Sequence, residues 1–122
     1  MKKQSHPAEV IAVRKLDLLN EADEVVGAVT VTLFRPEELP NSAGFSCSYR
    51  IHGLSTELVK EGRGSDSMQA LLLTLAKIGV DLYTSSEANT GRLRWCGDGN
   101  LGFPVFMKLN DKVPEPKDQL VL

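Results

Sequence analysis

The chain has 122 residues, of which 42% are hydrophobic and 25% charged, and its formal net charge is −2. This length fits one domain, and the even spread of charge over both halves argues against nucleic acid as a partner, because phosphate binding needs a concentrated basic face. No apolar run reaches the roughly 18 residues of a membrane span, and no apolar core follows the lysines of MKKQSHPAEV, as in a signal peptide. We therefore expect a cytoplasmic protein with reduced thiols that binds neither nucleic acid nor membrane.

The first part of the chain predicts a β-hairpin. After a polar arm (residues 1–9), strands are expected over Val10–Leu19 and Val25–Phe34, the second rich in β-branched residues. The polar segment NEADE joins them as a turn. One face of the second strand carries its large apolar side chains, namely Val29, Val31 and Leu33.

Further strands follow in the middle of the chain. The segment RPEELPNSAG contains two prolines and predicts a loop. Phe45–His52 then alternates apolar and polar residues, which is typical of a strand with one dry and one wet face. A short fourth strand is expected around Glu57–Lys60.

A long helix is predicted over Met68–Tyr83, with a wide apolar arc centred near Leu75. Its expected solvent stripe consists of Thr74, Lys77 and Asp81. Gly79 lies on the apolar arc, where a missing side chain would let helix and sheet approach closely. So wide an arc must be covered either by a loop and the last strands or by a second subunit, as a homodimer through the helix.

The residues around the start of this helix, GRGSDSMQA, allow two interpretations. Asp66 can serve as N-cap and Gln69 as the third helical residue of a capping box, while Gly62 and Gly64 let the chain turn from strand to helix. Alternatively, the free N–H groups at this turn bind an anion or a phosphate-bearing ligand. The residues of that alternative site are Arg63, Ser65 and Ser67.

The last part predicts a loop over Thr84–Gly91, a strand over Arg92–Cys96, a turn at GDGN and an edge strand over Leu101–Phe106. The domain thus covers residues 10–106, followed by a tail at 107–122. The expected fold class is α+β: an antiparallel sheet of about five strands, with one long, largely buried helix across one face.

The sequence shows no catalytic or metal-ligating constellation, so neither a cofactor nor a metal is expected. His52 stands alone on the wet face of its strand, Cys47 belongs to the dry face, and Cys96 is expected to be partly exposed. Trp95 is expected either to pack on the helix or to anchor a partner. Acidic loops are candidates for contact with a basic partner; their residues are Glu21, Asp23, Glu24, Glu37, Glu38 and Asp98.

Three strings in combination, GSDSMQAL before the Leu-rich helix, GRL-x-W and LGFP, resemble a small bacterial family catalogued as a domain of unknown function. The similarity covers about Val10 to Val105. The family implies no activity and no catalytic residue. By analogy of size and acidity, the chain is similar to immunity proteins of bacterial toxin systems. We therefore predict a non-catalytic module that binds and neutralises a cognate toxin, with a small-ligand or phosphate-binding protein, or an enzyme, as the alternative.

Overall fold

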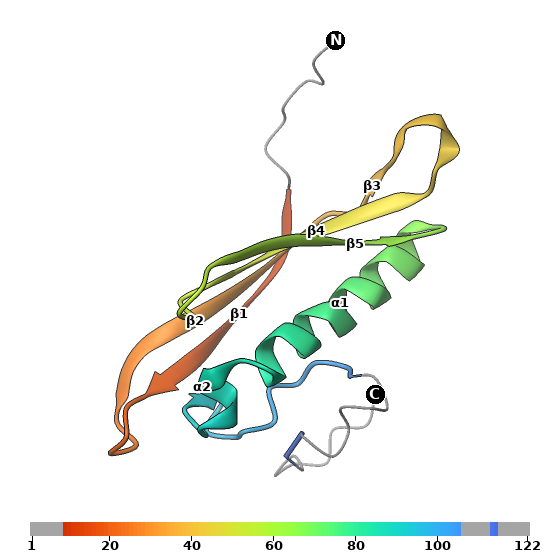
Figure 1. Cartoon of the computed structure of the whole chain (residues 1–122). Coiled ribbons are helices and arrows are strands. Elements are labelled where there is room, and N and C mark those ends of the chain that lie inside the picture. The colour runs from red at the N-terminus through yellow and green to blue at the C-terminus, as the bar shows by residue number, and fades with distance from the viewer. Residues whose placement is uncertain (1–8, 106–112, 115–122) are drawn as a thin grey trace.

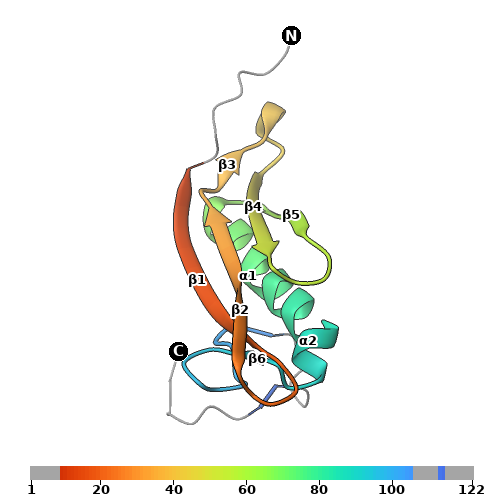
Figure 2. The same ribbon diagram turned by 90° about the vertical axis from the view of Figure 1, so that its left-hand side faces the viewer.

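The computed structural model describes residues 9–105 together with residues 113 and 114. The fold class is α+β, as predicted: an open antiparallel sheet of six strands with one main helix packed against it (Figures 1 and 2). Most of the predicted arm, the predicted tail except residues 113 and 114, and Phe106 lie outside the described residues.

The predicted hairpin is confirmed with its bounds. Strands β1 (Val10–Leu19) and β2 (Val25–Phe34) pair antiparallel, with Arg14 opposite Val31. The register shifts once near the start of β1, between Val10 and Ala12, and again near the turn. The predicted inner face of β2 is buried as expected, because its alternate residues point toward the helix.

The remaining strands are β3 (Glu37–Glu38), β4 (Phe45–His52), β5 (Leu58–Gly64) and β6 (Leu93–Arg94). β2 pairs with the second half of β4, β3 pairs with its start, and β5 pairs with β4 along nearly its whole length. β6 pairs with the end of β1. One edge of the sheet is therefore β5, and the opposite edge is β1 followed by β6. The predicted fourth strand was too short, and β3 with a single 3₁₀ turn (Pro40–Ser42) lies inside the predicted loop.

Helix α1 (Ser67–Tyr83) lies across β4 and β5, but the predicted solvent stripe is wrong. Thr74 is fully buried and donates through Oγ1 to the carbonyl of Cys47 at 3.2 Å, and Asp81 is largely covered. Only Lys77 is exposed as expected. In return, three large residues of the predicted apolar arc face outward, with exposed fractions of 39–69%: Met68, Leu72 and Leu73.

The glycines of β5 explain this rotation of the helix. A Cβ at Gly62 would lie 2.3 Å from Thr74 Oγ1, and a Cβ at Gly64 would lie 2.4 Å from the backbone nitrogen of Ala70. The helix backbone thus comes so close to β5 that only small side chains fit between them. The sequence prediction treated both glycines as turn residues, whereas both belong to the strand.

The C-terminal part differs most from the prediction. The expected loop contains a short helix, α2 (Ser86–Asn89), and residues 101–105 form no strand but run along α1. A Cβ at Gly79 would lie 2.6 Å from the carbonyl oxygen of Pro104. The missing side chain of Gly79 therefore lets this segment approach the helix closely. The prediction had instead expected the sheet to make this close approach.

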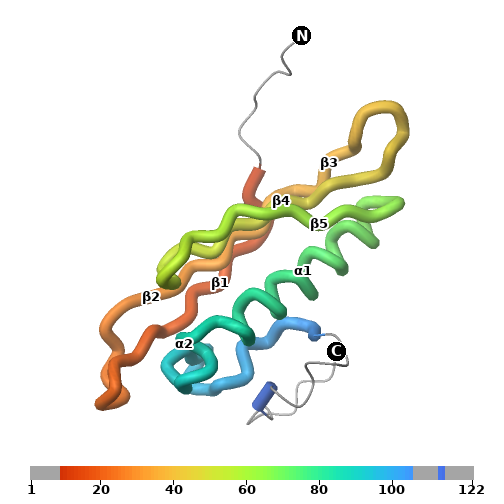
Figure 3. The backbone as a smooth tube through the Cα atoms, viewed as in Figure 1, coloured from red at the N-terminus to blue at the C-terminus, as the bar shows by residue number. Residues whose placement is uncertain are grey.

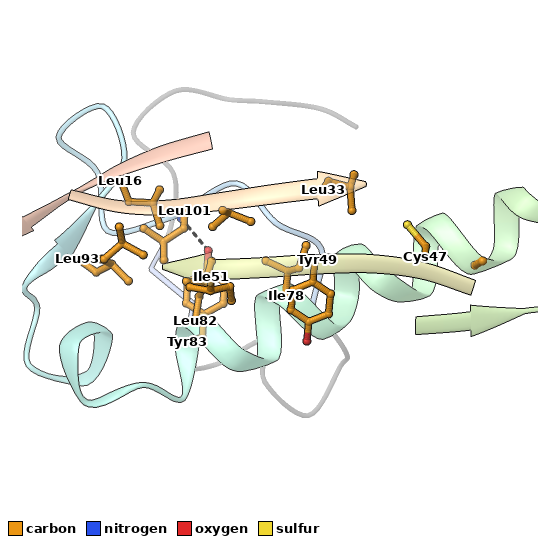
Figure 4. Packing of buried hydrophobic residues seen from close by; sticks show 13 residues of the cluster. Leu16, Leu33, Cys47, Tyr49, Ile51, Ile78, Leu82, Tyr83, Leu93 and Leu101 are labelled. Atoms are coloured by element: carbon orange, nitrogen blue, oxygen red, sulfur yellow. Dashed lines mark hydrogen bonds between the residues drawn. The ribbon is translucent and has the colours of Figure 1, made fainter. Parts of the chain in front are cut away.

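The core lies between the sheet and α1 (Figure 4). Its fully buried side chains come from both layers and include Leu16, Tyr49, Ile51, Ile78, Leu82 and Leu101. Tyr83 Oη accepts a hydrogen bond from the backbone N–H of Leu101 at 2.7 Å, the dashed line in Figure 4. This bond ties the C-terminal segment to the core.

Candidate functional site

The turn between β1 and β2 holds the first acidic group in a fixed shape. Asn20 Oδ1 accepts from the backbone N–H groups of Ala22 and Glu24 at 2.8 and 2.9 Å, and Asn20 Nδ2 donates to the Glu24 carboxylate. Asp23 has a positive φ of 61°, a backbone region that aspartate tolerates. Glu24 thus serves the turn, while Glu21 and Asp23 are exposed and form no ion pair with the described residues.

A polar hollow of about 530 Å³ adjoins this turn. Glu21 and Asp23 line one side, and Thr90 and Arg92 from the segment after α2 line the other. Arg92 Nε is tied to the carbonyl of Leu19 at 3.0 Å, so its position is set by the backbone of β1. Two exposed carboxylates and the guanidinium of Arg92, whose position is fixed, therefore line the same hollow.

The structure does not bring the predicted acidic residues together. Glu37 and Glu38 lie on β3, and the tube in Figure 3 places β3 at the opposite end of the sheet from the β1–β2 turn, as do Figures 1 and 2. Asp98 is half-buried, and its carboxylate accepts from the backbone N–H of Asn100 at 2.9 Å. A compact interface can use one acidic end of the molecule or the other.

Arg14 is a central residue that the sequence prediction missed. Its guanidinium carbon lies 3.7 Å from the centroid of the Trp95 ring and 4.9 Å from that of Phe103. Its Nη1 also donates to the carbonyls of Leu101 and Gly102 at 3.0 and 3.2 Å. Burial lowers the pKa of Arg14.

Two of the three strings that resemble the family meet at this contact. GRL-x-W supplies Trp95 and LGFP supplies Gly102, whose Cβ would lie 2.4 Å from the Trp95 ring. The cluster clamps the C-terminal segment onto β1. In the sequence, this arrangement was indicated only by the two motifs and by an arginine within the predicted first strand.

The start of α1 has the contacts of a capping motif. Asp66 Oδ1 accepts from the N–H of Gln69 at 2.8 Å, and Gln69 Oε1 accepts from the N–H of Ser65 at 2.6 Å. The predicted N-cap is confirmed. The side chain of Gln69 accepts from the N–H of the residue before the cap and not from the N–H of the cap itself. Arg63 points away into β5, where it pairs with Glu61 at 2.8 Å, and Ser67 is exposed as the first helical residue. The guanidinium of Arg63 and the backbone N–H of Ser65, both part of the alternative anion site, thus already have partners within the fold.

Two largely covered carboxylates, Asp81 of α1 and Glu87 of α2, are also engaged. Tyr49 Oη donates to Asp81, and Lys60 Nζ pairs with the same carboxylate at 2.9 Å. Burial, then the bond to Asp81, raises the pKa of Tyr49 far above its ordinary value. Although burial alone would raise the pKa of Glu87, its hydrogen bonds, first that from the N–H of Ser55, lower it. These contacts lock β4, β5 and α1 together.

Three further candidates from the sequence are His52, Cys47 and Cys96. His52 is exposed with Nδ1 2.9 Å from Glu57, and burial raises the pKa of Cys47, as fits a core thiol. Cys96 is exposed. Within residues 9–105, 113 and 114, no group of three or more histidine, cysteine or carboxylate side chains could hold a metal ion.

An apolar groove of about 440 Å³ runs between the first half of β1 and α1. The C-terminal segment closes its third side through Phe103 and Pro104. Its main lining residues from the strand and the helix are Ala12, Val13, Leu72 and Leu75. No sequence pattern pointed to this groove, because its walls lie far apart in the chain.

The described residues contain no helix long and apolar enough to cross a bilayer. No curated protein and no solved structure matches the chain. The model of a domain of unknown function, DUF6968, matches residues 12–105, which agrees with the extent of the resemblance found in the sequence. Since this match spans most of the chain, the protein belongs to the DUF6968 family.

Proposed function

We propose that this chain is a non-catalytic protein-binding domain, an immunity protein that binds and neutralises a cognate bacterial toxin through the β1–β2 turn. The observation that carries the proposal is the acidic turn itself. Glu21 and Asp23 are exposed on a backbone that Asn20 holds with two hydrogen bonds. Because the turn is already held in one shape, it loses little conformational freedom when a partner binds there, and this favours tight association.

The charge of the turn suggests the chemistry of the partner. Carboxylates speed the encounter with a basic surface and can occupy a site built for phosphate. We therefore expect a basic toxin that acts on nucleic acids or nucleotides. Inhibition of such a toxin needs a stable interface and no chemical step, so the domain needs no cofactor.

The two acidic ends of the molecule provide a matched test. The partner is captured with the full-length chain, identified by mass spectrometry and co-expressed with the wild type, the Glu21→Lys/Asp23→Lys variant or the Glu37→Lys/Glu38→Lys variant. Both variants change the charge equally at exposed positions. We expect the turn variant to associate more slowly and to protect cells less, and the β3 variant to behave like the wild type.

Two results would contradict the proposal. One is equal binding and protection by both charge variants, which would place the contact elsewhere. The other concerns His52→Ala, Ser67→Ala and Cys96→Ala, which we expect to keep full protection. A stable variant of these that still bound the toxin but failed to protect would indicate an enzyme.

A further inference from the structure

We propose that the apolar groove between β1 and α1 is a binding site for a small amphipathic molecule, an alkyl chain of medium length that ends in a carboxylate. The alkyl chain lies in the groove, and the carboxylate binds the guanidinium of Arg14. This inference is independent of the proposed function. It rests on the lining of the groove, on the small residue that leaves it open and on the charge of Arg14.

The groove reaches the hydrophobic core of the domain. Its volume of about 440 Å³ lies within the range of about 300–1,000 Å³ that is usual for small-molecule sites. Its lining includes Val31, Leu33 and Ile78, which belong to the buried core. An apolar ligand in the groove therefore gains contacts with core side chains and removes apolar surface from water.

Ala12 leaves the space that forms the groove. It pairs with Leu33, and residues directly opposite each other in a sheet share a face, so Ala12 belongs to the inner face of the sheet. Leu16, four positions further along that face, is fully buried, whereas Ala12 is exposed. The small side chain of Ala12 thus leaves open the space between β1 and Leu72, which is 57% exposed on α1.

The lining favours a hydrocarbon chain over a peptide. Apart from Arg14, every described residue that lines the groove is apolar or glycine. A peptide in this space would bring backbone N–H and C=O groups that need hydrogen-bond partners. The backbone groups of β1 and β2 lie in the plane of the sheet and do not point into its inner face. An alkyl chain needs no such partners.

Arg14 supplies the polar contact for the ligand. It is half-buried, and no carboxylate of the described residues forms an ion pair with it. A covered charge is usually paired with an opposite one. Nη1 makes both hydrogen bonds to the carbonyls of Leu101 and Gly102, and no described residue accepts from Nε or Nη2. These two atoms form one side of the planar fork and match the two oxygens of a carboxylate.

The charge and the length of the groove define the ligand further. Arg14 alone is charged among the described residues that line the groove, so it balances one negative charge. A carboxylate carries one charge, whereas a phosphate monoester carries about −1.5 to −2. At about 1.5 Å per residue, the helix wall from Leu72 to Ile78 is about 9 Å long. Octanoate is therefore a suitable probe.

The test is a calorimetric titration of the full-length chain with octanoate, octanol and octylammonium at concentrations below micelle formation. We expect octanoate to bind most tightly and octylammonium most weakly, because the three probes share a chain and differ in charge. Trp95 is the single tryptophan of the chain, and its ring centroid lies 3.7 Å from the guanidinium carbon of Arg14. Octanoate should therefore also change the fluorescence of Trp95.

Two variants then locate the site. Ala12→Phe should abolish binding of octanoate, because the new ring fills the groove and leaves Arg14 in place. The matched control is Ala28→Phe, the same change at an exposed alanine that pairs with Asp17 on the outer face, and it should bind like the wild type. Melting curves verify that each variant is folded.

Arg14→Gln tests the contact with the carboxylate. Loss of a charged hydrogen-bond donor should weaken octanoate binding by about ten- to a hundredfold and leave octanol binding unchanged. Arg14 also holds the C-terminal segment, so the comparison of octanoate with octanol on the wild type tests the same contact without a variant.

A wild-type chain that binds none of the three probes would overturn the proposal. So would octanoate binding that Ala12→Phe leaves intact, because the ligand would then lie elsewhere. Equal affinity of the wild type for octanoate and octanol would exclude Arg14 as the partner of the carboxylate.

Discussion

The two edges of the sheet are protected to very different degrees. β5 carries Lys60, Glu61 and Arg63, and α1 covers it so closely that Lys77 donates to the backbone carbonyl of Glu61 at 2.7 Å. The first half of β1 carries Val10, Ile11 and Val13 and has a groove where β5 has a helix.

Charges and a covering helix are the usual protection of an edge strand against further pairing. β5 has both, whereas the first half of β1 is not covered so closely by the helix, and its exposed Val10, Ile11 and Val13 adjoin the charged Arg14 and Lys15. The comparison shows that the helix covers one edge of the sheet closely and the other edge much less. It also shows that Gly62 and Gly64 let the helix lie close to β5, while the C-terminal segment packs against β1 through Arg14.

The largest expected effect tests how unevenly α1 is packed between the two edges. Ile78 is fully buried, whereas Leu72 on the groove is 57% exposed. Ile78→Ala should lower the free energy of unfolding by about 2–5 kcal/mol through lost burial and a cavity. Leu72→Ala should change it by about 0.5 kcal/mol or less. Equal losses in denaturant titrations would show that the helix is turned differently.

The next effect tests the close contact at the β5 edge. Gly64→Ala places a Cβ 2.4 Å from the backbone of Ala70, so the helix must shift, at a cost of about 1–3 kcal/mol. Gly27→Ala in β2 is the control, because its Cβ would meet only Leu18 at 3.9 Å. Thermal melting compares the two. A Gly64→Ala variant as stable as Gly27→Ala would rule out the close approach.

A smaller effect concerns the junction between β5 and α1. Asp66→Ala removes the acceptor for the Gln69 N–H and should cost about 1 kcal/mol. Ser67→Ala, one residue later and exposed, should cost less than about 0.5 kcal/mol. Chemical denaturation measures both. If Ser67→Ala proved the more damaging, the helix start would have a role beyond capping.

The smallest effect is the pH dependence of the β5 edge. Hydrogen bonds from Ser46 and then Arg63 lower the pKa of Glu61 below its ordinary value of 4.5. A lowered pKa in the folded state means that the contribution of Glu61 to stability is present above pH 4.5 and is lost as the pH falls through the folded-state pKa. Glu61→Gln should therefore lose less stability in acid than the wild type. Superimposable pH profiles would remove Glu61 from this edge network.

The sequence by itself determined the parts of the molecule that depend on local pattern. Alternation placed β1, β2 and β4, and Asp66 with Gln69 placed the start of the helix, because strand faces and helix caps follow from residues a few positions apart. The combination of three short strings indicated the family.

Only the tertiary structure decided which side of the helix is buried, where the C-terminal segment lies and which acidic residues are neighbours. Thr74 is polar by sequence, yet it is buried because Gly62 of the preceding strand has no side chain and lets the helix come close to it. Arg14 meets Trp95 across 81 positions of the chain, and the groove on β1 exists because α1 is held at β5. Such contacts depend on how closely elements remote in sequence approach each other, a quantity that periodicity along one strand or helix does not contain.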